Sequence, residues 1–160
     1  MSSLPCEGQS AFISRFPKVS VKVKLADHSF QSLDSVKFLL TVTNRSDSSQ
    51  KLLFDRPNMI YPWGTFVTII DRITNDTVTQ AINREMLSSK IYSEQELKDL
   101  SAFETLKSGA SISQSYILSN VAILKDYKQD LRPGKYKCVL SYYGNISNTF
   151  DFTIDKKNSR

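Results

Sequence analysis

The sequence predicts an all-β fold, an antiparallel β-sandwich of seven to eight strands. Two observations carry this prediction. Apolar and polar residues alternate with a period of two along most of the chain, which is typical of strands that bury one face. Short polar stretches rich in Asn, Asp, Ser, Pro and Gly separate these segments, as turns do. Many short strands joined by such turns describe two packed sheets.

The first half of the chain holds the clearest strands. Residues 19–25 direct their valines to one side and Lys22 and Lys24 to the other. Residues 35–44 direct Val36, Phe38, Leu40 and Val42 inward, and residues 51–54 form a short apolar run. Residues 65–71 and 76–80 form a hairpin-like pair around a polar turn.

The second half ends in a predicted hairpin. Residues 111–118 alternate again, with Ile112, Gln114 and Tyr116 on one side. Residues 135–143 and 148–155 then pair across Gly144-Asn145, and their alternate side chains face the core. These inward side chains are Tyr136, Cys138, Leu140, Tyr142, Phe150, Phe152 and Ile154.

Alternation disappears between about residues 81 and 105, where helix-forming residues predominate. Ser93 and Glu96 have the spacing of a capping box, in which both side chains bond backbone N–H groups at a helix start. We therefore expect a short helical insertion at residues 81–105, with the helix near 94–101. Insertions on rigid scaffolds often carry function.

A length of 160 residues suits one domain, and a hydrophobic content of 40% is sufficient for a packed core. We expect a flexible lead over residues 1–15, a single domain over 16–155 and a flexible tail over 156–160, because both ends lack periodicity.

The net charge of +5 would attract nucleic acid or an anionic surface if the charges gathered on one face. Lys22, Lys24, Lys135 and Lys137 instead alternate with apolar residues, which indicates solvated strand faces. Aromatic residues do not interleave with the basic ones as a stacking platform requires. No nucleic-acid partner is expected.

No apolar run reaches the roughly 18 residues that span a bilayer, and the N-terminus lacks an apolar leader core. The expected location is extracytoplasmic, secreted or at the cell envelope, with a leader removed; a cytoplasmic location stays open as the alternative. Peripheral or lipid-anchored attachment also stays open, with lipid attachment conceivable at Cys6, although Ser3-Leu4-Pro5 is a poor lipidation signal.

Tyr136 precedes Cys138 by two residues near the start of the penultimate strand. This is the spacing of the tyrosine corner, so the chain resembles immunoglobulin-like domains, and the resemblance implies structural roles for both residues. Phe38 and Leu40 stand on the strand where a true immunoglobulin domain has a second Cys, and Trp63 lies in a loop. The resemblance therefore lacks the disulfide and the buried Trp.

A wider resemblance covers residues 35–154. Thr43-Asn44-Arg45-Ser46, a strand ending in Asp71, Leu106-Lys107-Ser108-Gly109 and Pro133-Gly134-Lys135-Tyr136 together look like bacterial intracellular proteinase inhibitor domains. The non-catalytic sandwich of deuterolysin-type metallopeptidases is similar. These resemblances imply a fold and, as an alternative function, proteinase inhibition through surface loops.

Catalytic and metal chemistry find little support. His28 is the only histidine, and its neighbours in a turn do not deliver the geometry of a triad. Two distant cysteines and one histidine do not build a zinc site, and Lys125 and Lys128 oppose cation binding at Asp126 and Asp130. No catalytic residue, metal site or cofactor is predicted, and an enzyme with an unrecognised site is kept as a low-ranking alternative.

One segment exceeds what a turn needs. Residues 57–66 hold Met59, Ile60, Tyr61 and Trp63 beside Pro57 and Pro62, and these residue types dominate binding hot spots. Capping of one end of the sandwich is the competing explanation. The first functional hypothesis is a non-enzymatic module that binds a protein or a glycan through these four residues.

Overall fold

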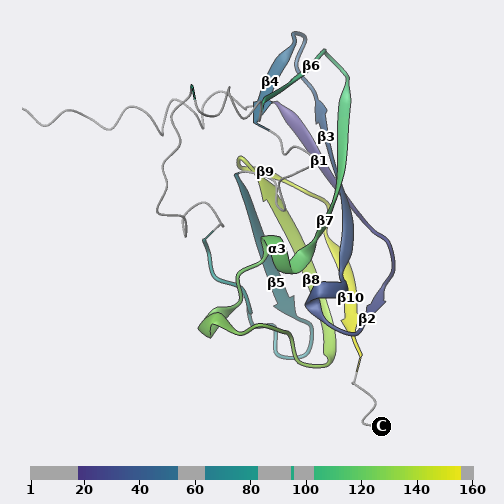
Figure 1. Cartoon of the computed structure of the whole chain (residues 1–160), viewed down its shortest axis with the longest axis vertical. Helices are drawn as coiled ribbons and strands as arrows, with labels where there is room; N and C mark the ends of the chain where they lie inside the picture. The colour runs from purple at the N-terminus through teal and green to yellow at the C-terminus, as the bar shows by residue number, and fades with distance from the viewer. Residues whose placement is uncertain (1–17, 54–63, 83–94, 96–102, 156–160) are drawn as a thin grey trace, which may run out of the picture.

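The computed structural model describes residues 18–53, 64–82, 95 and 103–155. These residues form two β-sheets packed against each other, with a small two-stranded sheet at one end (Figure 1). The all-β prediction is confirmed, and the sandwich arrangement places one buried layer of side chains between the two main sheets.

The first sheet has the strand order β1-β3-β7, and both pairs are antiparallel. Its strands are β1 (Val19–Leu25), β3 (Lys37–Asn44) and β7 (Ser111–Ile117). The register sets Val42 opposite both Val21 and Ile112, so the inward positions predicted from alternation share one face. Within the described residues β7 is an edge strand, and its inward Ile112 is half-buried.

The second sheet has the order β2-β10-β8-β5. Its strands are β2 (Ser29–Phe30), β10 (Phe150–Ile154), β8 (Gly134–Tyr142) and β5 (Thr65–Asp71), and β9 (Asn145–Ile146) pairs with the end of β8. The predicted C-terminal hairpin is present, because Phe150 lies opposite Cys138 and Phe152 opposite Tyr136.

One pair departs from the predicted antiparallel arrangement. β2 runs parallel to β10, with Ser29 opposite Thr153. The chain passes from β1 to β2 without reversing its direction (Figure 1), so β2 joins the second sheet parallel to its neighbour. Backbone N–H groups of Thr153 and Asp155 donate to the carbonyl oxygens of His28 and Phe30, each at 2.8 Å.

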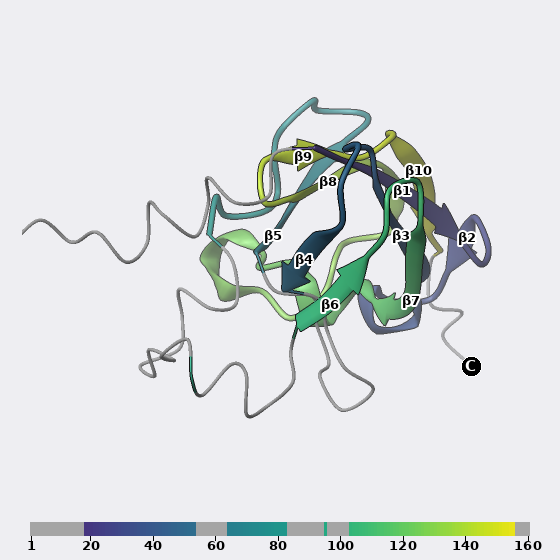
Figure 2. The ribbon, with the colours of Figure 1, turned by 90° about the horizontal axis from the view of Figure 1, so that it is seen from above.

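The core lies between the inner faces of the two sheets, with β8 and β10 on one side and β3 and β7 on the other (Figure 2). Burying each large aliphatic or aromatic side chain contributes about 1.5–3 kcal/mol. The fully buried set contains Val36, Phe38, Leu40, Val42, Leu52, Ile69, Leu118, Leu140 and Tyr142.

A buried amide holds the corner where β3 ends. The Asn44 side chain is fully buried, and its Nδ2 donates to the carbonyl oxygens of Ser48 at 2.8 Å and Leu106 at 3.0 Å. Its Oδ1 accepts from the backbone N–H of Ser46 at 2.9 Å. The corner leads into the small sheet of β4 (Gln50–Leu53) and β6 (Phe103–Leu106).

A second, partly buried connection ties β1 to the opposite sheet. The backbone N–H of Val23 donates to Asn148 Oδ1 at 2.8 Å, and Asn148 Nδ2 donates to the Val23 carbonyl oxygen at 3.0 Å. Asn148 lies between β9 and β10, so its amide satisfies the edge of β1 in the way that a neighbouring strand would.

The predicted insertion over residues 81–105 falls mostly outside the described residues; of its predicted helix only Gln95 is described, and it is helical. The end of the insertion differs from the prediction, because residues 103–105 belong to β6. Glu104 lies opposite Leu52 on β4. Residues 103–105 are extended because they pair with β4, which is distant in the sequence. The local sequence pattern does not reveal such a pairing.

Short elements account for the remaining differences. The described residues contain ten strands, more than the seven to eight predicted. β2, β6 and β9 were not predicted, and β2 and β9 have only two residues each and read as turns. Helix α3 (Leu118–Val121) follows β7 and was not predicted; Leu118 and Val121 are its buried residues. The predicted strand at 76–80 forms isolated bridges, with Thr77 opposite Ile70 and Thr79 opposite Leu124.

Candidate binding surface

An apolar surface crosses the outer face of the second sheet near the start of β5. The register places Phe66 on β5 opposite Ser141 on β8, and Ser141 opposite Ile146 on β9. Directly opposed residues of antiparallel strands point to the same face. Phe66 and Ile146 therefore flank the small Ser141 on one surface, and the two residues are 37% and 72% exposed.

The next row extends this surface without adding charge. Thr68 lies opposite Val139, and both are half-buried on the same outer face. We call Phe66, Thr68, Val139, Ser141 and Ile146 the Phe66 face. It combines exposed apolar side chains with small hydroxyls, a composition that favours contact with another apolar surface over contact with water.

A rigid turn supports one end of the Phe66 face. Tyr143 and Gly144 join β8 to β9 with φ angles of 43° and 80°, the left-handed pair that a two-residue hairpin turn requires. An aromatic residue rarely adopts this conformation. The Tyr143 ring packs edge-on against Tyr142, with 4.9 Å between ring centroids, and covers Gly64.

Gly64 is thereby locked where β5 begins. Its φ is +66°, and its carbonyl oxygen accepts from the Tyr143 N–H at 2.9 Å. Trp63 precedes Gly64 directly in the sequence, so the segment predicted to bind a partner joins the sheet beside the Phe66 face. The predicted residues Met59, Ile60, Tyr61 and Trp63 lie outside the described residues, and their role stays a prediction.

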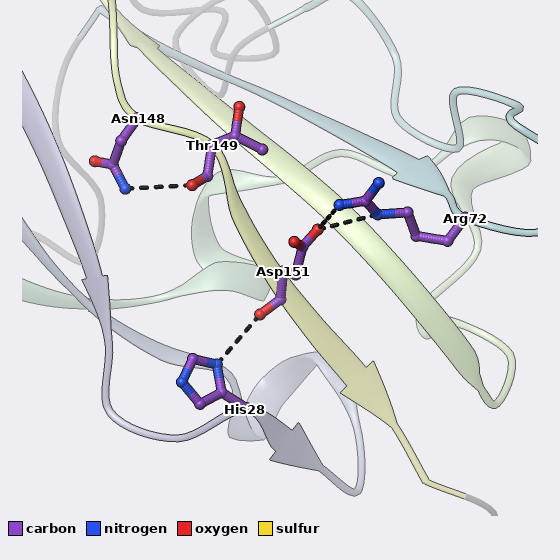
Figure 3. A network of polar contacts seen from close by, with 5 residues as sticks. All are labelled: His28, Arg72, Asn148, Thr149 and Asp151. Carbon is purple, nitrogen blue, oxygen red and sulfur yellow. Dashed lines mark hydrogen bonds and ion pairs between the residues drawn. The ribbon is translucent and has the colours of Figure 1, made fainter.

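The opposite end of the same sheet face is charged (Figure 3). Asp151 on β10 lies opposite Lys137 on β8 and accepts from Arg72 Nε at 3.1 Å and Nη2 at 2.5 Å. Both members of the Arg72–Asp151 pair are about half exposed, at 47% and 59% of the side chain, so solvent screens the interaction. The outer face of this sheet therefore has a charged end, at Arg72 and Asp151, and an apolar end, at the Phe66 face.

His28 approaches this charged end without forming a catalytic arrangement. Its Nδ1 lies 3.5 Å from the backbone oxygen of Asp151, not from the carboxylate (Figure 3). The residues that the structure describes contain no group of three His, Cys, Asp or Glu side chains suited to a metal ion. The observed contacts of His28 do not orient it as a base.

Asp126 and Asp130, weighed above as a weak cation site, have separate roles. Asp130 Oδ1 accepts from the backbone N–H groups of Leu33 at 2.8 Å and Leu131 at 2.9 Å. Asp126 pairs with Lys128 at 3.9 Å on the surface. One carboxylate holds a turn together and the other is solvated.

Tyr136 and Cys138, the residues singled out for structural roles, both point into the core. Tyr136 Oη donates to the Arg132 carbonyl oxygen at 2.8 Å, which ties β8 to the chain before it. Burial, with a smaller contribution from Asp71, raises the pKa of Tyr136. Cys138 is a free thiol whose burial raises its pKa well above the ordinary value, so it stays protonated and unreactive.

Sequence reasoning included Phe66 in the candidate segment but missed Ile146 and Val139. Val139 alternates with core residues and reads as an ordinary outward position. Ile146 lies between Asn145 and Ser147, so a large apolar residue inside a polar turn was the available signal. Only the pairing of β9 with β8 brings Ile146 level with Phe66.

No family model matches the sequence, and no curated protein matches it. Among solved structures, the alkylpurine DNA glycosylase AlkC of Pseudomonas fluorescens, bound to DNA with an abasic site analogue, is 11% identical over 87% of this chain and 31% of its own length, with a TM-score of 0.47. A β-glucosidase of Listeria innocua in complex with glucose is 11% identical over 86% of this chain and 16% of its own, with a TM-score of 0.43.

These matches carry no inference about activity. The chain spans less than a third of the length of each of these structures, at 31% and 16%. Helices long and apolar enough to cross a membrane are absent from the described part of the chain.

Proposed function

We propose that this chain is a non-enzymatic binding module and that its ligand docks on the Phe66 face together with the adjoining residues 57–63. The observation that carries the proposal is the pair of exposed apolar side chains, Phe66 and Ile146, aligned across Ser141. Burial of the part of each residue that is still exposed would favour binding, by less than the roughly 1.5–3 kcal/mol of a side chain that starts fully exposed. A sheet holds them in place, which limits the entropy lost on docking.

The chemistry of the face supports an apolar protein segment as the ligand, with a glycan as the alternative. Its described residues are uncharged, and their polar groups are hydroxyls. Hot spots of protein interfaces gather aromatic and large aliphatic side chains at the centre of a patch and polar groups around it. The paired charges of Arg72 and Asp151 lie toward the other end of the same sheet face.

We further propose that the sandwich is of the immunoglobulin-like type. The Tyr136–Arg132 hydrogen bond supports this, since a tyrosine near the start of a late strand bonds the preceding backbone in such domains. Proteinase inhibition stays the alternative function implied by the family resemblance. Incubating the purified chain with serine peptidases and metallopeptidases tests this alternative. If the peptidases keep full activity at micromolar concentrations of the chain, proteinase inhibition is excluded.

A secreted or envelope location accompanies the proposal. A module that binds through its surface suits an exposed position, where its partner is another surface. The unprocessed gene product tests this, because a leader ahead of residue 1 is expected and its absence in the full gene would favour the cytoplasm.

The docking site is tested with a double substitution, Phe66→Ser and Ile146→Ser. The purified chain is screened against a glycan array and a library of displayed peptides, and the strongest hit is resynthesised and titrated. We expect the double variant to lower the affinity for that hit at least about tenfold, because it removes most of the apolar contact.

Leu39→Ser is the matched control. Leu39 lies on the outer face of the other sheet and is 38% exposed, nearly the same as Phe66 at 37%. The control should keep the wild-type affinity, and circular dichroism should show that both variants fold. Equal losses in the two variants, or undiminished binding by the double variant, would contradict the proposed site.

A further inference from the structure

The outer face of the first sheet carries an unbalanced positive charge. Outward positions of residues 18–25, 37–45 and 111–117 alternate with the buried ones, and all of them are exposed or half-buried. Five of these positions are basic, and none of them is acidic. They are Lys18, Lys22, Lys24, Lys37 and Arg45.

This face accounts for the charge of the whole chain. The sequence has 21 basic and 16 acidic residues, a net charge of +5, so the rest of the chain is balanced. On the other sheet, by contrast, Asp151 pairs with Arg72 and lies opposite Lys137. Asp27 and Asp47 lie beyond the ends of β1 and β3, as Lys18 and Arg45 also do. The strands themselves carry Lys22, Lys24 and Lys37 on this face and no acidic residue, so the centre of the face is positive.

Hydroxyl groups fill the positions between the basic side chains. The register aligns Ser20, Thr43 and Ser111 in one row and Lys22, Thr41 and Ser113 in the next. The hydroxyls are paired, with 2.7 Å between Thr41 and Ser113 and 2.7 Å between Thr43 and Ser111, and Arg45 Nε donates to Ser20 Oγ at 3.0 Å. The strands thus present ordered rows of hydroxyls, not freely rotating ones.

The basic groups are spaced for an extended polyanion. Lys22 and Lys24 lie two residues apart on β1, about 6.7 Å by strand geometry. Lys37 on β3 extends the series. Leu39 is the partner of Lys24, and Lys37 lies on the same face two residues before Leu39 in the sequence. Charges at such intervals along a flat face attract a linear chain with repeated anionic groups more strongly than a single small anion.

We propose that this face binds an anionic polysaccharide, a sulfated or uronic-acid chain. Lysine and arginine pair with sulfate and carboxylate groups through charge-assisted hydrogen bonds, and the hydroxyl rows bond the hydroxyls of the sugar rings. Nucleic acid is disfavoured because the outward positions of these three strands hold no aromatic side chain on which a base would stack. A membrane is disfavoured because Leu39 and Ile117 are the only large apolar residues among them.

The site lies on the sheet opposite the Phe66 face, so the two proposals are independent. A chain bearing Phe66→Ser and Ile146→Ser should bind the polysaccharide as the wild type does. Loss of the Phe66 ligand and loss of the polysaccharide are therefore separately measurable.

The test titrates the full chain with heparin fragments and with polygalacturonate, at NaCl concentrations from 50 to 300 mM, using dextran as the neutral control. We expect binding to both anionic chains, weakening with salt, and none to dextran. The double variant Lys22→Ser, Lys24→Ser should lose about tenfold in affinity and show a shallower salt dependence.

Lys125→Ser, Lys135→Ser is the matched control, because both lysines are exposed away from this face and the net charge falls equally. It should lose less than about twofold. A second variant, Thr41→Val with Ser113→Ala, removes one hydroxyl pair without changing charge and should weaken binding at unchanged salt dependence.

Three results would overturn the proposal. Equal losses in the two lysine variants would show attraction by net charge alone. Tighter binding to vesicles of phosphatidylcholine with phosphatidylserine, or to a single-stranded oligonucleotide, would assign the face to a membrane or to nucleic acid. Absence of binding to both anionic polysaccharides at 50 mM NaCl would show that the face does not bind an anionic polysaccharide.

Discussion

The ring of Tyr143 lies over Gly64 so closely that a Cβ atom at residue 64 would overlap it. The contact joins the start of β5 to the turn between β8 and β9, the two ends that support the Phe66 face. The identity of residue 64 therefore bears on the binding surface as well as on stability.

Gly64→Ala should destabilise the fold for two reasons. The left-handed φ costs an alanine about 1–2 kcal/mol, and the overlap with Tyr143 adds about 1–3 kcal/mol. Gly109→Ala separates these contributions, because Gly109 also has a left-handed φ, of +72°, but nothing lies within 4 Å of a Cβ there. Urea unfolding of both variants measures the difference, and equal losses would show that the ring moves aside without cost.

Asn148→Ala should lower the free energy of unfolding by about 1–3 kcal/mol, because the N–H and carbonyl groups of Val23 lose their partner. Asn148→Asp should lose less, since an oxygen still accepts from the Val23 N–H. Urea unfolding of the two variants and the wild type measures this order. A loss in the aspartate variant as large as in the alanine variant would mean that the carboxylate does not take the place of the amide.

Tyr136→Phe should cost about 0.5–1.5 kcal/mol, because it removes the hydrogen bond to Arg132 and keeps the ring. The ring stacks on Phe152 with 5.6 Å between centroids, so Tyr136→Leu should cost more. Thermal unfolding of both variants checks the order. A phenylalanine variant as stable as the wild type would leave the hydroxyl without a structural role.

Alkaline pH should destabilise the protein through Cys138. Burial raises the pKa of the folded thiol, so the stabilisation is complete below the unfolded pKa of roughly 8.5 and is lost as the pH rises toward the folded pKa. Over that window the free energy of unfolding should fall by about 1.4 kcal/mol per pH unit for this group. Burial also raises the pKa values of Tyr136 and Tyr142. The stabilisation that depends on their protonated hydroxyls begins to be lost near pH 10.

Comparing Cys138→Ala with the wild type between pH 8 and 10 isolates the thiol. The absolute stability of the variant will differ because a buried side chain becomes smaller, but the slope of stability against pH is the measured quantity. The variant should show the shallower slope. Identical slopes would mean that the folded thiol ionises as readily as the unfolded one.

The predictable part of the fold was the part with a strong period. Val19, Phe38 and Phe152 lie on buried faces where alternation placed them, because one side of each strand must face the core. The two-residue strands carry too few residues for a period, and β6 depends on pairing with β4, about 50 residues earlier, at Leu52 and Glu104.

The candidate surface was only partly predictable for the same reason. Phe66 lay within a segment rich in aromatic residues, whereas Ile146 becomes its neighbour through two successive pairings with Ser141. Lys22 and Lys24 were expected on a solvated face, as found. Their alignment with Lys37 and with the hydroxyl rows depends on a register that a single strand does not reveal.

The buried corner at Asn44 constrains how the protein is made. Asn44-Arg45-Ser46 is an Asn-x-Ser triplet, the acceptor sequence for N-linked glycans in a eukaryotic secretory pathway. The fold uses both atoms of this amide, at 0% exposure, and a sugar attached to Nδ2 would have no room there. A chain glycosylated at Asn44 during synthesis would be unable to close the corner, so bacterial expression suits this protein better than secretion from yeast or mammalian cells.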